Sequence, residues 1–313
     1  MKNYFFNYRL LIMSIILLSL HACNLGNQGN NQVLTDSLLA DSLKTAEQIS
    51  KTGLGDDTSL VSVFYQIPSA HQVLAVLSSD SKLFNSSLLL STDLAKNKIG
   101  EKNLAISFGC YTTDVAYCIA SNQFQAAVKQ YATVRQLADQ LGINTAIDEN
   151  MKKRIEKNLE NIDSLQTIST ESYFTIVDNL VALDNGKTLT LITVGGYVES
   201  LYLLTNANKA FNMNDKHIKQ LANLKTVTEN IIKCLNYFKT DAQISSMEPM
   251  FNELLGIYGQ LSPVKTGKLE VTTQKEGIVI SGGTEYAFTE KQFNELKTAV
   301  NKMRNAIIIE GLK

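Results

Sequence analysis

Proline is nearly absent from this chain of 313 residues, and its scarcity limits the possible folds more than any other sequence feature. Only three prolines occur, and Leu, Ala, Lys and Asn dominate the long stretches between them. Proline interrupts helices, and most of these abundant residues favour them. The sequence therefore predicts a mainly α fold, a multi-helix bundle of antiparallel helical hairpins.

The amino terminus has the pattern of a signal peptide. Lys2 and Arg9 precede an uncharged apolar run, Leu10–Leu20. This run is about half as long as the ~20 residues that a helix needs to cross a bilayer. A basic segment followed by a short apolar run predicts a signal peptide over residues 1–22.

The sequence Leu20, His21, Ala22, Cys23 resembles the lipobox of bacterial lipoproteins, although His21 departs from the usual small middle residue. The resemblance implies that the Cys23 sulfur carries a lipid, which would anchor the protein to a membrane. The alternative is an ordinary secretory signal cut near Ala22. Asn24 does not match the Asp that retains lipoproteins at an inner membrane, so the resemblance implies an outer-membrane position facing the periplasm.

Residues 23–32 are polar and predict a flexible tether, which leaves residues 33–313 for one helical domain. Hydrophobic residues make up 44% of the chain and charged residues 19%, which is typical of a folded globular body. The net charge of −1 gives no basic excess for nucleic-acid binding. The expected partners are the membrane, through the lipid, and an envelope protein.

Apolar periodicity predicts a series of helices along the domain. Gly142 is expected to end one of them in the left-handed conformation. Leu269 to Ile280 alternates in the manner of a small β-hairpin near the C-terminus, and Thr289 with Gln292 forms a capping box for a last helix. The helices are predicted at 38–49, 68–77, 85–98, 101–121, 122–141, 145–165, 171–183, 188–207, 215–238 and 246–258.

One faint internal repeat aligns residues 108–124 with residues 194–211. Each segment has a glycine two positions before a tyrosine. Two interpretations remain open: chance similarity of amphipathic helices, or a fold of two related halves. The matched residues are Gly109, Tyr111 and Asn122 in the first segment and Gly195, Tyr197 and Asn208 in the second.

The first of these segments also resembles known sequences. Residues 109–142 are similar to one tetratricopeptide-like hairpin, but no closing proline or 34-residue array follows. Tyr111, Asp114 and Tyr117, followed by the helix end at residues 137–143, resemble a family of helical lipoproteins from Bacteroidetes-type bacteria more closely. That resemblance implies a lipid anchor and a helical domain, and it implies no activity.

Common catalytic motifs are absent, and only His71 and His217 follow the signal peptide, so no metal site, cofactor or catalytic residue is expected. Gly186, Lys187 and Thr188 match the end of a phosphate loop, but no strand precedes them. A helix-to-helix turn at 184–186 explains these residues better.

Two carboxylates are the most interesting polar residues. On helices, Asp114 would lie beside Tyr111 and Tyr117, and Glu199 beside Tyr197 and Tyr202. The two acids could share a proton or hold a cation across the bundle. The alternatives are a buried hydrogen-bond network that fixes helix register, or solvated acids. These six residues are the candidate ligand-binding set, with Cys23 as the lipidation site.

Three cysteines, Cys110, Cys118 and Cys234, follow the signal peptide region. Cys110 and Cys118 are too far apart on one helix to form a disulfide with each other. Pairing of Cys234 with either is one possibility, and buried free thiols are the favoured one.

These observations predict a membrane-anchored lipoprotein with a helical binding or scaffold domain, in which binding is favoured over catalysis. The rival hypothesis is an envelope enzyme that uses Asp114 and Glu199 in a cleft between helices. A third is a purely structural envelope component.

Overall fold

The computed structural model describes residues 58–79, 83–143, 153–155, 157–158, 161–207, 210–274 and 277–311. The predicted signal peptide, Cys23, the tether and the helix expected at 38–49 lie outside the described residues. The described part is helical except for one antiparallel hairpin, which confirms the predicted mainly α class and the small hairpin near the C-terminus.

The described elements follow one another closely along the chain. The short elements η2 and η4 are 3₁₀-helices, and η6 is a π-helical turn. The elements are α3 (Thr58–Tyr65), α4 (Ala70–Leu74), η2 (Ala75–Ser79), η4 (Ser86–Leu88), α5 (Thr92–Lys96), α6 (Glu101–Ala120), α7 (Phe124–Leu141), α9 (Ile162–Ala182), α10 (Gly186–Asn206), α11 (Lys216–Ala222), α12 (Lys225–Tyr237), α13 (Ala242–Ser245), α14 (Glu248–Gly259), β1 (Ser262–Gln274), β2 (Gly277–Ala287), α15 (Glu290–Arg304) and η6 (Asn305–Glu310).

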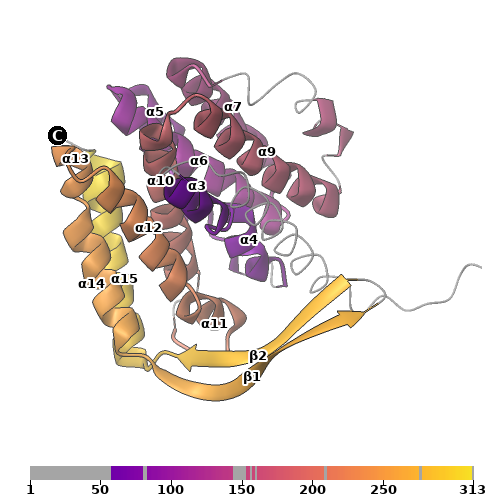
Figure 1. Ribbon diagram of the computed structural model, residues 1–313. Coiled ribbons are helices and arrows are strands. Elements are labelled where there is room, and N and C mark those ends of the chain that lie inside the picture. Colours follow the sequence, from indigo (N-terminus) through magenta and orange to yellow (C-terminus); the bar gives the residue numbers. More distant parts are fainter. Residues whose placement is uncertain are drawn as a thin grey trace, which may run out of the picture.

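Helices α6 and α10 form the centre of the bundle, as Figure 1 shows. Helices α7 and α9 lie on one side of this pair, and α12, α14 and α15 lie on the other. The hairpin β1–β2 extends from the end of α14 past α11, with Val271 opposite Ile280 in its register. Every site described below is built on the central pair.

The two central helices run in the same direction and approach each other very closely. Near their starts, the Thr188 hydroxyl donates to a Glu101 carboxylate oxygen at 2.9 Å. A Cβ added at Gly109 would lie 2.0 Å from the carbonyl oxygen of Ile192, and one added at Gly195 would lie 2.1 Å from that of Ile106. Each helix therefore presents a glycine to the other's backbone, and a larger residue at either position would push the pair apart.

This crossing relates the two aligned segments only locally. The helices α6 and α10 contact each other reciprocally through the glycines that the alignment matched, Gly109 and Gly195. The elements that follow them differ, because one long helix, α7, follows α6, whereas the shorter α11 and α12 follow α10. The correspondence is limited to the central helix pair.

Several predicted features are confirmed. Gly142 follows α7 in the left-handed conformation with φ 69°, and Thr289 and Gln292 form the capping box of α15. Residues 184–186 form the helix-to-helix turn, in which the Asn185 side chain accepts from the Thr188 amide. The residues that match the end of a phosphate loop therefore form the start of α10.

The prediction of one helix at 85–98 is wrong, because this segment forms two short helices, η4 and α5. Leu89 is extended between them, and the Ser91 side chain caps α5. Side chains from α6 and α7 hold the backbone of this break, as described below. Sequence periodicity does not register such tertiary hydrogen bonds.

Two further helix boundaries are corrected. The helix predicted at 215–238 is split near Leu224, whose carbonyl accepts a hydrogen bond from the Tyr197 hydroxyl at 3.1 Å. Much of the helix predicted at 145–165 lies outside the described residues. Its last positions belong to α9, which begins after the capping residue Asn161 and therefore starts before the predicted 171.

The segment Leu60–Ser78 is long and apolar enough by composition to cross a membrane. In the structure it forms α3, α4 and η2, with a break around Pro68, and half of its most apolar window is buried inside the bundle. Its apolar residues, among them Phe64 and Leu74, belong to the core.

Candidate functional site

The three residues of the Tyr-x-x-Asp-x-x-Tyr pattern hold one extended stretch of backbone. Asp114 accepts from the Leu90 amide at 2.8 Å, and the Tyr111 hydroxyl donates to the Ser91 carbonyl at 2.5 Å. Tyr117 donates to the carbonyl of Leu83 and accepts from the amide of Asn85. All three side chains are buried, and their shared role is to fasten residues 83–91 onto α6.

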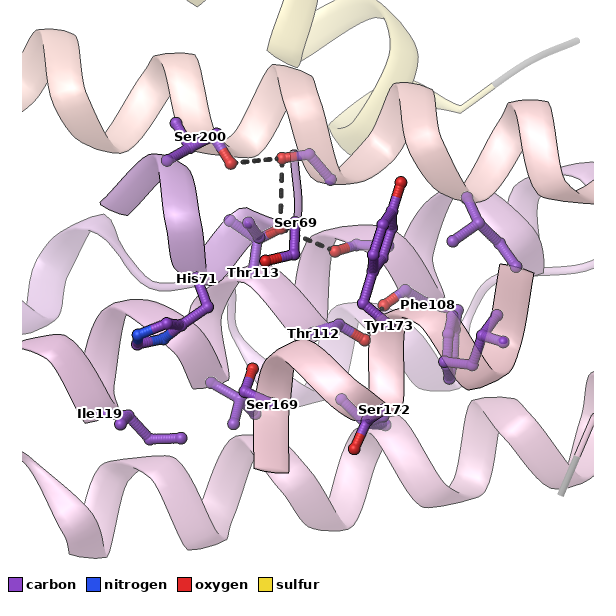
Figure 2. Close-up of a pocket in the computed structure, with 18 of the residues that line it drawn as sticks. Ser69, His71, Phe108, Thr112, Thr113, Ile119, Ser169, Ser172, Tyr173 and Ser200 are labelled. Atoms are coloured by element: carbon purple, nitrogen blue, oxygen red, sulfur yellow. Dashed lines mark hydrogen bonds between the residues drawn. The ribbon is translucent and has the colours of Figure 1, made fainter. Parts of the chain in front are cut away.

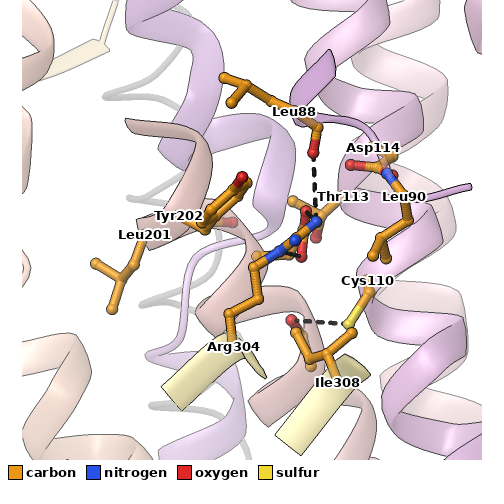
Figure 3. A network of polar contacts seen from close by, with 12 residues as sticks. Leu88, Leu90, Cys110, Thr113, Asp114, Leu201, Tyr202, Arg304 and Ile308 are labelled. Carbon is orange, nitrogen blue, oxygen red and sulfur yellow. Dashed lines mark hydrogen bonds and ion pairs between the residues drawn. The ribbon is translucent and has the colours of Figure 1, made fainter. Parts of the chain in front are cut away.

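A buried charged network lies where α6, α10 and α15 meet. Glu199 is fully buried, and both of its carboxylate oxygens accept from Arg304, from Nε and Nη2, at 2.8 Å each. Figure 3 shows the guanidinium between Tyr202 and the Leu88 carbonyl, to which Nη2 donates at 3.3 Å. Its Cζ atom lies 3.8 Å from the centre of the Tyr202 ring. The Nε and Nη2 groups of Arg304 therefore donate to groups of the protein itself, and its charge is paired with that of Glu199.

Asp114 adjoins this ion pair, and the charge of Glu199 affects its ionisation. Burial, followed by the negative charge of Glu199, raises the pKa of Asp114 well above its usual range. Burial also raises the pKa of Glu199, but the hydrogen bonds and the positive charge of Arg304 oppose that rise. The proton therefore sits on Asp114, which can donate it to the Glu199 carboxylate. Both acids lie in the core and not in solvent, which excludes the solvated alternative, and their contacts with Leu90 and Arg304 form a buried hydrogen-bond network.

Arg304 was missed by sequence reasoning. The signal was present, because Arg304 follows Val300 by one helical turn and lies next to Met303 in the apolar stripe of α15. A charged residue within such a stripe indicates a buried partner of opposite charge.

The remaining candidate residues are divided between two places. Tyr202 contacts Arg304, whereas the Tyr197 hydroxyl bonds with Leu224 and with Thr228 Oγ1 at 2.7 Å. The structure thus brings Asp114, Glu199 and Tyr202 together and places Tyr197 elsewhere. Asp114 and Glu199 are both fully buried, and neither lines the apolar cavity described next.

An apolar cavity of about 140 Å³ lies on another face of the same helix pair. Its walls come from α4, α6, α7, α9 and α10, and Figure 2 shows part of the lining. Among the six candidate residues, only Tyr197 contributes to this wall. Val128 of α7 also lines it and is 47% exposed, so the cavity reaches the molecular surface there. A cavity of this size can hold a body as large as a benzene ring.

Hydroxyl groups in the cavity wall are bonded to the helices that carry them. Thr112 donates to the Phe108 carbonyl at 2.8 Å, Thr193 to that of Leu189 at 2.8 Å, and Ser200 to that of Gly196 at 2.8 Å. Each hydroxyl thus uses its proton within the wall. The wall offers a ligand mainly apolar surface with a few oxygen lone pairs.

His71 differs from these three hydroxyl groups, which are bonded within their own helices. Its side chain is buried in α4, and no described group meets either ring nitrogen at hydrogen-bonding geometry. Burial lowers its pKa to about 4, and the nearby Gln166 amide opposes this in part. The ring is therefore neutral at pH 7, with one nitrogen as a donor and the other as an acceptor.

The three described cysteines are free and buried, which agrees with the favoured prediction and leaves Cys234 unpaired with Cys110 or Cys118. The Cys110 thiol contacts the Gly195 carbonyl at the helix crossing, with its sulfur 3.4 Å from the oxygen. Burial raises the pKa of Cys118 and of Cys234 to about 12. These thiols are packing groups rather than nucleophiles.

No cluster of three or more His, Cys, Asp or Glu side chains suited to a metal ion occurs within the described ranges. Comparisons with known protein families, with curated proteins and with solved structures found no match for the chain. The functional argument therefore depends on the geometry of the sites alone.

Proposed function

We propose that this protein is a lipid-anchored envelope protein whose helical domain binds an apolar ligand in the cavity between α4, α6, α7, α9 and α10. The cavity carries this proposal. It has a volume of about 140 Å³ and a mainly apolar wall, and it reaches the surface near Val128. Concave apolar sites of this kind are the usual binding sites for small molecules.

The buried network supports binding over catalysis. A catalytic carboxylate must reach a substrate, whereas Asp114 and Glu199 contact protein groups and have no exposed surface. Their partners come from α15, α10 and the segment at 83–91, so the network fastens these elements together. The enzyme hypothesis therefore has less support than the binding hypothesis.

Ligand binding can be tested on the full chain in detergent micelles with 4-fluorotoluene as the probe, observed by fluorine NMR. Thr112→Leu places a larger side chain in the cavity, and we expect it to weaken binding about tenfold, which corresponds to about 1.4 kcal/mol. Thr175→Leu is the matched control. Thr175 lies on the exposed face of α9 and makes the same hydrogen bond to the carbonyl four residues earlier, at 2.9 Å against 2.8 Å for Thr112.

Binding that is unchanged in the control and weakened in Thr112→Leu supports the proposal. No protein-dependent signal beyond micelle partitioning, or equal weakening in both variants, would count against it.

The anchor is tested separately. Mass spectrometry of the mature amino-terminal peptide should find acyl groups on Cys23, and Cys23→Ala should release the protein from the membrane fraction, because stable anchoring needs the buried chains. An unmodified thiol at Cys23 in the native protein would contradict this part of the proposal.

A further inference from the structure

The cavity wall limits the charge of any ligand. Among the described residues that line it there is no Lys, Arg, Asp or Glu. An ionised head group inside would lose its hydration without gaining a counter-charge, at a cost of several kcal/mol. His71 does not supply that charge, because its ring is neutral at pH 7. A carboxylate, phosphate or ammonium group is therefore disfavoured.

The same wall contains a buried histidine, His71, whose ring nitrogens have no described partner at hydrogen-bonding geometry. In Figure 2 the His71 ring lies at one end of the labelled lining residues together with Ile119, and Phe108 and Tyr173 lie toward the other end. The His71 side chain is only 4% exposed, so bulk water does not readily satisfy it. An unsatisfied buried donor or acceptor costs about 1–3 kcal/mol.

The hydroxyls that α6 and α10 contribute at Thr112, Thr113 and Ser200 do not compete with His71 for this role. Thr113 donates within the helix pair, with the Gly109 carbonyl at 3.0 Å and that of Gly196 at 3.2 Å, and Thr112 and Ser200 are bonded to their own helices. A ligand oxygen would have to break one of these bonds to receive a proton there. At His71 the Gln166 side chain can engage only one ring nitrogen, so a ligand oxygen can gain a hydrogen bond at the other without breaking a bond between described groups.

We infer that the ligand is an uncharged apolar molecule with one hydroxyl or carbonyl group, and that His71 binds this group while the apolar part lies in the remainder of the cavity. The size of the cavity limits the enclosed part to about one six-membered ring or an equivalent length of chain. This inference rests on the proposed function, because it names the ligand class of the same cavity.

The test compares the binding of four probes that share one fluorophenyl ring and differ in the group opposite the fluorine. The full chain in micelles is mixed with 4-fluorotoluene, 4-fluorobenzyl alcohol, 4-fluorobenzoate or 4-fluorobenzylammonium. We expect the wild type to bind the alcohol most tightly and the two ions at least about tenfold more weakly than the alcohol. His71→Leu should bind 4-fluorotoluene as well as the wild type and bind the alcohol about 5–10-fold more weakly, the usual effect of one hydrogen bond. His71→Gln retains a donor and an acceptor, so it should recover part of the preference for the alcohol.

The outcomes separate the two proposals. If no probe binds, the proposed function itself fails. If 4-fluorotoluene binds but His71→Leu leaves the ratio of alcohol to toluene affinity unchanged, the cavity is a binding site and the role of His71 is wrong. If an ionic probe binds more tightly than the alcohol, the uncharged ligand class is overturned. Because toluene binding also reports an intact cavity, loss of folding in a variant would be detected by the same experiment.

Discussion

The helix pair α6–α10 supports two buried regions that differ in one respect. The network around Arg304 contains Asp114, Glu199 and Arg304, whose hydrogen bonds are made to protein groups of α10, α15 and residues 88–90, and it encloses the Asp114 Oδ1 atom, which has no described partner. The cavity contains no charged side chain among its described lining residues, yet it includes His71, whose ring nitrogens have no described partner. If the number of charged side chains were the only criterion, the network would be taken as the functional site.

The comparison shows that free space beside a polar group is the better guide. Buried ionic groups that are enclosed by protein leave no room for a ligand, and they fix the packing of the elements that supply them. An apolar cavity with one unsatisfied polar group leaves both space and a hydrogen bond. We therefore assign the network to the architecture and the cavity to ligand binding.

The largest expected effect concerns the ion pair. Glu199→Leu leaves Arg304 buried without its counter-charge, so we expect the free energy of unfolding to fall by about 3–5 kcal/mol. The double variant Glu199→Leu with Arg304→Met removes both charges and should recover most of this loss. Urea denaturation measures both variants. A single variant as stable as the wild type would show that the network does not hold the helices together.

The next effect concerns the helix crossing that both regions share. Gly109→Ala places a methyl group 2.0 Å from the Ile192 carbonyl oxygen, so the helices must separate, and we expect a loss of about 3 kcal/mol, the upper part of the range for overpacking. Gly256→Ala in α14 is the control, because nothing lies within 4 Å of the added atom. That variant should gain up to about 1 kcal/mol from helix propensity. Equal stability of the two variants in thermal unfolding would contradict the close approach.

A smaller effect tests whether Asp114 carries a proton in the folded state. The pKa of Asp114 is raised in the folded state, so its contribution to stability is complete below its ordinary value of about 3.9 and is lost as the pH rises through the folded-state pKa. Asp114→Asn resembles the protonated form and should be within about 1 kcal/mol of the wild type at pH 5. Its stability relative to the wild type should then increase toward pH 8.

Asp93→Asn is the control for this pH series. Asp93 is exposed, and its hydrogen bond with Lys96 lowers its pKa, so it is ionised in both the folded and the unfolded state between pH 5 and pH 8. The difference between Asp93→Asn and the wild type should therefore stay constant over this range. A constant difference for Asp114→Asn as well would show that Asp114 carries no proton in the folded state.

The sequence was sufficient to predict features that depend on local chemistry. The capping box of Thr289, the left-handed Gly142 and the turn at 184–186 each follow from a few neighbouring residues, and the structure confirms them. The sequence analysis offered the proximity of Asp114 and Glu199 only as one possibility, and it is the close packing of the two helices through Gly109 and Gly195 that produces it.

Features that depend on distant contacts were not predicted. The break at residues 89–91 is held by side chains of α6 and by Gln130 of α7, which donates to the Leu90 carbonyl at 3.0 Å. Arg304 lies about one hundred residues after its partner Glu199. The cavity is built from five helices, and His71 is distinguished only by the partners it lacks. None of these properties appears in a local pattern of residues.

A crystal structure of the protein soaked with 4-bromobenzyl alcohol tests the central claim most directly, because bromine can be located by anomalous scattering. We predict a bromine peak inside the cavity, with the ligand hydroxyl within hydrogen-bonding distance of a His71 ring nitrogen, and no peak at the Arg304 network. A bromine peak beside Arg304 with the cavity empty would contradict the assignment of the two regions.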